Sequence, residues 1–146
     1  GLPPVIRALT PHDRTAWTRL WRALLVSCKT DLPDEIYAAQ WARLMDGHPA
    51  AGRLAVRDGR PVGLVHFTFH THGWMAPPVC YLQDLYVCAD SRGLGIGRRL
   101  VDAVRDEAET LGAADLRWLR PRPRPEPRWR HVPGGPLAGL LGDARL

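Results

Sequence analysis

Lysine is almost absent from this chain: Lys29 is the single lysine among 20 basic residues in 146, and the others are arginines. The net charge of +5 is also unevenly distributed. Residues 121–146 carry five arginines against two acids, whereas the first 120 residues carry only two more basic than acidic side chains. The pI near 9.7 therefore does not predict a nucleic-acid-binding face on the main body, and we expect no nucleic-acid partner.

Cysteine is scarce, and long apolar runs are missing. Cys28, Cys80 and Cys88 form an odd set without CxxC spacing, which argues against a disulfide framework and against a zinc site. Unpaired thiols are typical of a reducing compartment, and no stretch approaches the roughly 18 apolar residues of a membrane span. The composition therefore predicts a cytoplasmic globular domain with no membrane segment and no metal site.

The period of the apolar pattern changes several times along the chain, and each change predicts a different element. Apolar residues recur every three or four positions, as on one face of a helix, at about 13–30, 33–45 and 97–111. Strand-like runs occupy 5–10, 79–88 and 115–119, and Asp58-Gly59 predicts a hairpin turn between two strands within 52–69. The predicted order β-α-α-β-β-β-α-β gives an α/β fold with a mixed-direction sheet and flanking helices.

The character of the chain changes after Leu119. Residues 120–146 contain six of the 14 prolines and begin RPRPRPEP, which cannot form a helix and favours an extended polyproline conformation. We therefore predict two parts, a folded domain over 1–119 and an irregular Pro/Arg-rich tail over 120–146. The abrupt change of composition suggests an out-of-frame reading of a GC-rich coding sequence, a hypothesis that sequencing the locus tests.

Three glycines alternate in DLYVCADSRGLGIGRRLV (84–101), between a predicted strand and a predicted helix. Glycine adopts positive φ and lets a ligand approach closely, while the unpaired N–H groups of a helix N-terminus attract an anion. The stretch therefore predicts a phosphate site. It lacks the Lys-Ser/Thr end of a P-loop, and its third glycine comes one residue too early for the Rossmann pattern. The pattern that remains is Arg-x-x-Gly-x-Gly, formed by Arg92, Gly95 and Gly97.

Together with GLVHFTFHTHGW (63–74) and CYLQDLYV (80–87), this stretch resembles motif A of the GNAT N-acetyltransferases. It is similar in particular to the diamine/polyamine acetyltransferases and to small yeast histone/polyamine acetyltransferases, over about residues 5 to 119. The resemblance implies a GNAT-type sheet and acetyl-CoA as the cosubstrate. It also implies that the pantetheine arm pairs with the backbone of Leu85, Tyr86 and Val87, and that the diphosphate is held by Arg92, Gly93, Leu94, Gly95, Ile96, Gly97 and Arg98.

The implied reaction is the attack of an amine on a thioester. It requires a base, because an ammonium group has no lone pair. Asp84 is the candidate catalytic base on the strand before the glycine loop, whereas Gln83 beside it cannot accept a proton at neutral pH. The alternative is that Asp84 serves only as a hydrogen-bonding group at the point where this strand splays from its neighbour.

Candidate acceptor contacts come from two other regions of the chain. His70 and Trp74 resemble an F-H-x-x-x-W feature near the acceptor site of such enzymes. Asp34 and Glu35 lie near the start of the second predicted helix, which borders the acceptor groove in this fold. Their charge would suit a cationic amine; the alternative is an ordinary solvated helix start.

Several other side chains favour structural roles. His66, His70 and His72 share one face of a strand by their spacing of two. The neighbouring sequence offers no companion zinc ligand, so we expect ordinary histidines on a polar face. Trp17 and Trp21 are expected in the core or in the wall of the cofactor site.

We therefore expect an acetyl-CoA-dependent N-acetyltransferase that acts on a small primary amine, with a diamine or polyamine favoured. Family members continue after 115–119 with a helix, whose tyrosine protonates the leaving thiolate, and with further strands; residues 120–146 contain no tyrosine, so these elements are missing or aberrant. A catalytically weak acetyl-CoA-binding remnant, acetylation of a protein lysine or N-terminus, and nucleic-acid binding by the arginine-rich tail stay open as alternatives. Exposed sheet edges favour a homodimer.

Overall fold

The computed structural model describes residues 2–118, and within them the predicted order of elements is confirmed. Five strands form one sheet in the order β1-β2-β3-β4-β5. Neighbouring strands run antiparallel from β1 to β4, and β5 runs parallel to β4, so the sheet is of mixed direction as predicted. The strands are β1 (Val5–Ala8), β2 (Ala50–Arg57), β3 (Arg60–His72), β4 (Met75–Val87) and β5 (Asp115–Trp118).

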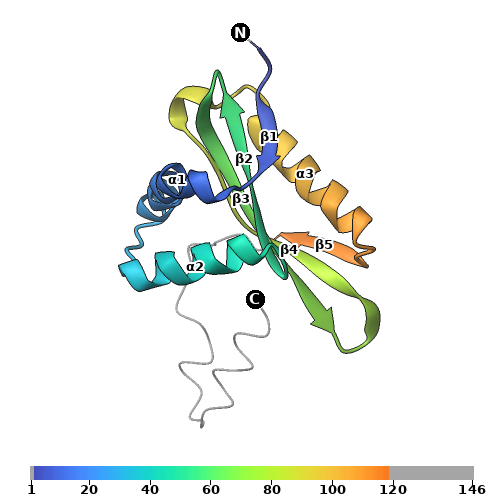
Figure 1. Cartoon of the computed structure of the whole chain (residues 1–146). Coiled ribbons are helices and arrows are strands. Elements are labelled where there is room, and N and C mark those ends of the chain that lie inside the picture. The colour runs from blue at the N-terminus through green and yellow to red at the C-terminus, as the bar shows by residue number, and fades with distance from the viewer. Residues whose placement is uncertain (1, 119–146) are drawn as a thin grey trace.

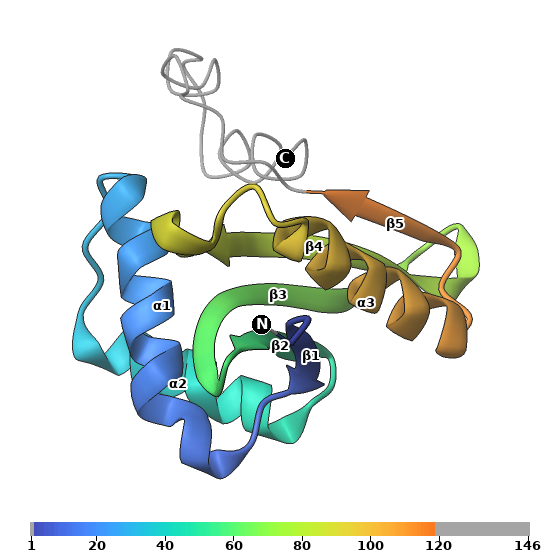
Figure 2. The ribbon, with the colours of Figure 1, turned by 90° about the horizontal axis from the view of Figure 1, so that it is seen from above.

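Helices cover both faces of the sheet. Figure 1 shows α1 and α2 on one side and α3 on the other, and Figure 2 shows the same layers from above. The helices are α1 (Arg14–Ser27), α2 (Asp34–Asp46) and α3 (Ile96–Thr110), with short 3-10 turns η1 (Pro11–Asp13) and η2 (Ala89–Ser91). The predicted tail at 120–146, with the missing or aberrant C-terminal elements, lies outside the described residues.

Each face of the sheet has its own apolar core, because successive side chains of a strand point to opposite faces. The core beneath α3 includes Val65, Phe67, Phe69, Leu100 and Val104. The core beneath α1 and α2 includes Trp17, Leu20, Trp41, Leu54 and Leu64. On β3, the residue that alternates with Val65 and Phe67 is His66, so its side chain enters the second core.

The turn between β2 and β3 is the one that the sequence predicts. Asp58 and Gly59 both have positive φ, 50° and 76°. Two successive residues of positive φ form a two-residue hairpin turn, whose twist matches that of the two flanking strands. This turn sets the register in which Arg57 pairs with Arg60.

The pairing of β4 changes halfway along the strand, and this change opens the candidate site. β4 pairs with β5 only over residues 79–82. The β3–β4 register then shifts between His66 and Phe67, which leaves Gln83 without a partner on β3. A bulge of this kind bends a strand and redirects its side chains. Over 83–87, β4 therefore has one edge paired with β3 and, within residues 2–118, no strand on its other edge.

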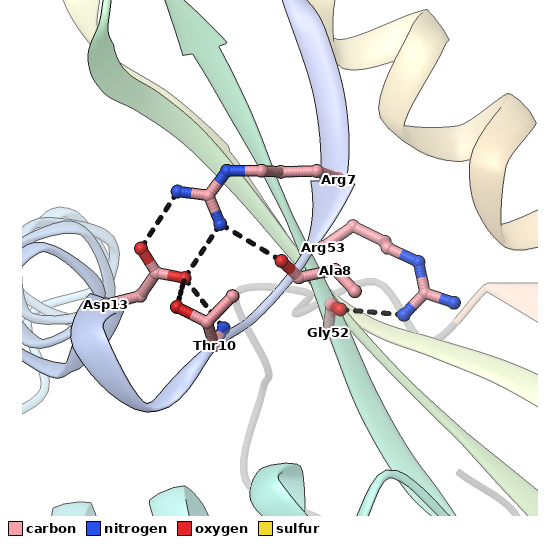
Figure 3. Close-up of polar contacts among 6 residues, drawn as sticks. All are labelled: Arg7, Ala8, Thr10, Asp13, Gly52 and Arg53. Carbon is pink, nitrogen blue, oxygen red and sulfur yellow. Dashed lines mark hydrogen bonds and ion pairs between the residues drawn. The ribbon is translucent and has the colours of Figure 1, made fainter.

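A charged network ties the start of α1 to the sheet (Figure 3). Two guanidinium nitrogens of Arg7, on β1, donate to the carboxylate of Asp13 at 2.8 and 2.9 Å. The amide and hydroxyl of Thr10 donate to the same carboxylate at 2.7 and 3.0 Å. The bonded Arg7 guanidinium holds the pKa of the Asp13 carboxyl well below its usual range. The network fixes the beginning of α1, and Trp17 follows within the first turn of that helix.

Candidate active site

The glycine loop leads from η2 into α3 and leaves backbone amides available. Gly93 and Gly95 have positive φ, 79° and 78°, and Gly95 is the N-cap of α3. The amide of Arg99 donates to the carbonyl of Gly95 at 3.1 Å, as the first hydrogen bond of the helix. The amides of residues 96–98 therefore have no partner within the helix. Together with the helix dipole, they form a site for an anion.

An open cavity of about 500 Å³ lies beside these amides. Its walls come from β4 beyond the bulge, from the glycine loop and from the C-terminal end of α1, where Leu24 and Ser27 contribute. Leu94 and Arg98 are exposed and are not part of the lining. The predicted cofactor residues that do line the cavity are Leu85, Tyr86, Val87, Arg92, Gly93, Gly95, Ile96 and Gly97.

Arg92 lies across the end of β4. Its Nε donates to the carbonyl of Val87 at 3.0 Å, and the guanidinium carbon lies 5.9 Å from the centre of the Tyr86 ring. The hydrogen bond to Val87 uses Nε, so the two terminal nitrogens of the guanidinium do not bind that carbonyl. The guanidinium is thus oriented in the cavity wall with donors that suit an anion.

The backbone of β4 alternates between its two edges beyond the bulge. The carbonyl of Tyr86 points toward β3, where it lies 3.1 Å from the position that a Cβ on Gly63 would occupy. The backbone groups of Leu85 and Val87 consequently face the open edge, and the Val87 carbonyl there accepts from Arg92. The expectation that the Tyr86 backbone faces the open edge is therefore wrong; Tyr86 contributes its side chain to the cavity instead.

Asp84 lies on β4 directly after the bulge, opposite His66. Its Oδ2 is 2.8 Å from Nδ1 of His66, and its side chain is 28% exposed against 1% for His66. Nε2 of His66 lies 2.8 Å from Nε1 of Trp17. The imidazole is enclosed by the rings of Trp17 and Trp21, whose centroids lie 6.0 and 5.5 Å away. One partly exposed carboxylate with a buried hydrogen-bonding partner can accept a proton from a ligand.

The expectation that His66 is an ordinary polar-face histidine is wrong, because His66 is fully buried. The sequence contained a usable signal. His66 is the one strongly polar side chain in the apolar run VGLVHF, and a buried imidazole requires hydrogen-bonding partners. Trp17 lies in the core as expected, but its indole also supplies one of these partners.

The four predicted acceptor residues are all exposed. His70 is exposed near the end of the β3–β4 hairpin, which extends past the helices in Figure 1, and its ring packs edge-on against Tyr81 with centroids 5.0 Å apart. Trp74 is 94% exposed at the tip of the same hairpin. The remaining two, Asp34 and Glu35, are exposed in the first turn of α2.

Metal-ion sites and membrane-spanning helices are two further features that bear on function. Among the side chains that the structure describes, no group of three or more His, Cys, Asp or Glu residues is arranged to hold a metal ion. None of the helices in that range has the length and apolar composition needed to cross a membrane.

The fold and the comparisons with known proteins define a class of protein, the acetyltransferases. Residues 14–124 match the acetyltransferase (GNAT) family, and the chain belongs to that family. Solved structures with a similar fold include complexes with coenzyme A and with a bisubstrate analogue. Membership of this family makes the protein an N-acetyltransferase that uses acetyl-CoA, which confirms the predicted enzyme class and cosubstrate.

Relatives of known activity act on different amines. The chain is 33% identical over 118 residues to the D-amino-acid N-acetyltransferase HPA3 of Saccharomyces cerevisiae, covering 79% of this chain and 73% of the relative. It is 28% identical to the aminoglycoside N(6')-acetyltransferase type 1 of Stenotrophomonas maltophilia, covering 77% and 72%. The solved ribosomal-protein-alanine N-acetyltransferase of Brucella melitensis biovar Abortus 2308 superimposes with a TM-score of 0.71, at 27% identity and 82% coverage of each chain.

Proposed function

We propose that the protein acetylates the primary amine of a small molecule, with Asp84 as the general base and a diamine or polyamine as the favoured acceptor. The observation that carries the proposal is the position of Asp84. Its carboxylate is partly exposed on β4 at the bulge, directly before the residues that line the cavity. No other acidic residue lies on β4.

The cosubstrate has a natural place in this geometry. The free amides of residues 96–98 and the Arg92 guanidinium would hold its diphosphate. The outward-facing backbone of Leu85 and the amide of Val87 would pair with the pantetheine arm, as an added strand pairs with a sheet edge. Leu85, Val87, Arg92, Ile96 and Gly97 all line the same cavity, so the thioester would lie near the bulge and near Asp84.

The chemistry then follows from the charge of the acceptor. A primary ammonium gives one proton to Asp84, and its freed lone pair attacks the thioester carbonyl. The C–N bond forms as the C–S bond breaks, and the thiolate takes up a proton. The amide nitrogen loses its second proton, so that one ammonium and one thioester yield one amide, one thiol and one proton. Removing a general base of this kind costs about 10²- to 10⁴-fold in rate.

An amine screen with matched variants tests the proposal. Purified protein is titrated with acetyl-CoA by calorimetry and then assayed with a diamine, a polyamine, a D-amino acid, an aminoglycoside and a lysine peptide. Asp84→Asn should retain acetyl-CoA affinity and lose at least about 100-fold in kcat, whereas Asp102→Asn, an exposed carboxyl on α3, should behave like the unchanged protein.

Gly95→Glu provides a control for the cosubstrate site, because it places a negative charge beside the proposed diphosphate position and should weaken acetyl-CoA binding. Undiminished turnover by Asp84→Asn would contradict the assignment of the base. Binding of acetyl-CoA without turnover on any amine would instead favour a binding remnant, and preference for the lysine peptide would favour a protein acceptor.

A further inference from the structure

His66 is fully buried, and both of its ring nitrogens are engaged. Nε2 lies 2.8 Å from the indole Nε1 of Trp17, and Nδ1 lies 2.8 Å from Oδ2 of Asp84. Trp17 and His66 are both fully buried, whereas Asp84 reaches the surface. Three residues from α1, β3 and β4 thus form one chain of hydrogen bonds that runs from the core to the candidate base.

The chemistry of the indole fixes the position of the imidazole proton. A tryptophan N–H can only donate, so Nε2 of His66 must offer its lone pair. A neutral imidazole whose Nε2 accepts carries its proton on Nδ1. Nδ1–H therefore donates to Asp84, and the carboxylate is the acceptor. A doubly protonated imidazole would place two N–H donors against each other at Trp17, so the observed distances require the neutral ring.

The surroundings prevent the imidazole from escaping this arrangement. Trp21 packs edge-on against His66 with ring centroids 5.5 Å apart, and it also stacks on Trp17 at 5.3 Å. The buried rings exclude water, which strengthens the hydrogen bonds that are made and raises the cost of breaking them. A flip of the His66 ring would break both bonds at once.

We propose that Trp17 and His66 are positioning residues that keep Asp84 in its proton-accepting state and turn its second oxygen, Oδ1, toward the acceptor amine. The proposal rests on the proposed role of Asp84 as the base. His66 occupies Oδ2, and among the described residues no hydrogen bond reaches Oδ1. Gln83, the residue before Asp84, offers no second carboxylate with which Asp84 could share a proton. The Nδ1–H of His66 instead stabilises the charged carboxylate and restricts its rotation.

Trp17→Phe tests this arrangement, because it removes the N–H and keeps an aromatic ring. The phenyl ring of this variant would leave Nε2 of His66 without its donor, so the imidazole loses one of its two anchors and holds its Nδ1–H less firmly against Asp84. Trp21→Phe is the matched control. Trp21 lies on the same helix and in the same aromatic cluster, but its buried Nε1 has no hydrogen-bond partner. Trp21→Phe therefore reports the cost of a smaller ring beside His66 without the loss of a hydrogen bond, and any loss of kcat should be equal for a cationic and a neutral acceptor.

The measurement compares two acceptors of one shape. One is the best amine from the screen, which is cationic at the assay pH. The other is its analogue with a difluoromethylene group next to the carbon that bears the amine, which is largely neutral. Trp17→Phe should lower kcat by roughly tenfold for the cationic amine, as a part of the contribution of a general base, and leave kcat for the neutral analogue and the acetyl-CoA affinity unchanged. Equal losses for both amines, or no loss, would overturn the proposal.

Variants of His66 and a spectroscopic measurement complete the test. His66→Asn keeps an N–H donor near the Nδ1 position and should retain more of the cationic-amine rate than His66→Leu, which keeps none. In the unchanged protein, ¹H–¹⁵N spectra of the imidazole at neutral pH should show a protonated Nδ1 and an unprotonated Nε2, and the opposite tautomer or an imidazolium would refute the arrangement without any activity assay. Failure of the proposed function itself is distinct, because the unchanged protein would then acetylate no amine.

Discussion

Replacing Arg7 with methionine should lower the free energy of unfolding by about 2 kcal/mol at neutral pH. The variant keeps the apolar stem and removes two hydrogen bonds to Asp13, whose side chain is only 9% exposed. The Asp13 carboxylate would retain only the donors from Thr10. Because the Arg7 side chain is 38% exposed, solvent screens part of the ion pair, and the loss stays below that of a fully buried pair.

The loss should shrink as the solution becomes acidic. Arg7 lowers the pKa of Asp13 in the folded protein below its ordinary value of 3.8. As the pH falls, the unfolded chain therefore takes up the proton first, so the stabilisation is complete well above pH 4 and is lost progressively below it. The difference between the unchanged protein and Arg7→Met should fall by about 1 kcal/mol between pH 6 and pH 3.

Urea unfolding followed by tryptophan fluorescence measures both effects, because Trp17, Trp21 and Trp41 are buried. The matched control is Arg105→Met, which removes an exposed ion pair within α3 and should leave the urea midpoint nearly unchanged. A pH-independent difference, or a loss no larger than that of the control, would show that the Arg7 network does not stabilise the start of α1.

Three further changes test other parts of the structure. Gly95→Ala should cost about 1–2 kcal/mol of stability, because the backbone at Gly95 has a φ of 78°. Gly97→Ala should leave stability unchanged or raise it by up to about 1 kcal/mol, because an added Cβ there meets other atoms only at 3.9 Å. Urea unfolding that ranks the two variants the other way would contradict the loop geometry. Leu100→Ala should cost about 2–5 kcal/mol, because Leu100 is fully buried between α3 and the sheet, and a thermal unfolding profile like that of the unchanged protein would argue against this packing. A maleimide at neutral pH should label exposed Cys28 and spare Cys80, whose burial raises the pKa of its thiol to about 11, as peptide mass spectrometry can establish; equal labelling would indicate that the core opens readily.

The order of elements was predictable because each signal lies within a short segment. The Asp58-Gly59 turn depends on two residues, and the apolar stripe of α3 depends on a spacing of four residues along one helix. The bulge at Gln83 depends on how β4 pairs with two different strands. The family resemblance implies that this strand splays from its neighbour, but nothing in CYLQDLYV alone marks the residue at which the pairing changes, so the position of the bulge came from the structure.

The candidate site divides in the same way. The glycine loop was predictable from Gly93, Gly95 and Gly97, because positive φ and helix capping are local properties. The environment of Asp84 was not predictable from the sequence. Trp17 and His66 are 49 residues apart in the sequence and meet only when α1 packs on the sheet. Because a strand pattern shows which face a side chain takes but not its partner, His66 was assigned to the wrong surroundings.

The groups proposed to hold the coenzyme come almost entirely from residues 85–97, while the support for Asp84 reaches back to the first long helix. A mutation at Trp17, which does not line the cavity, would therefore change the rate of acetyl transfer to an amine without weakening the binding of coenzyme A. The preference for one amine over another could therefore change during evolution while acetyl-CoA stays the acetyl donor.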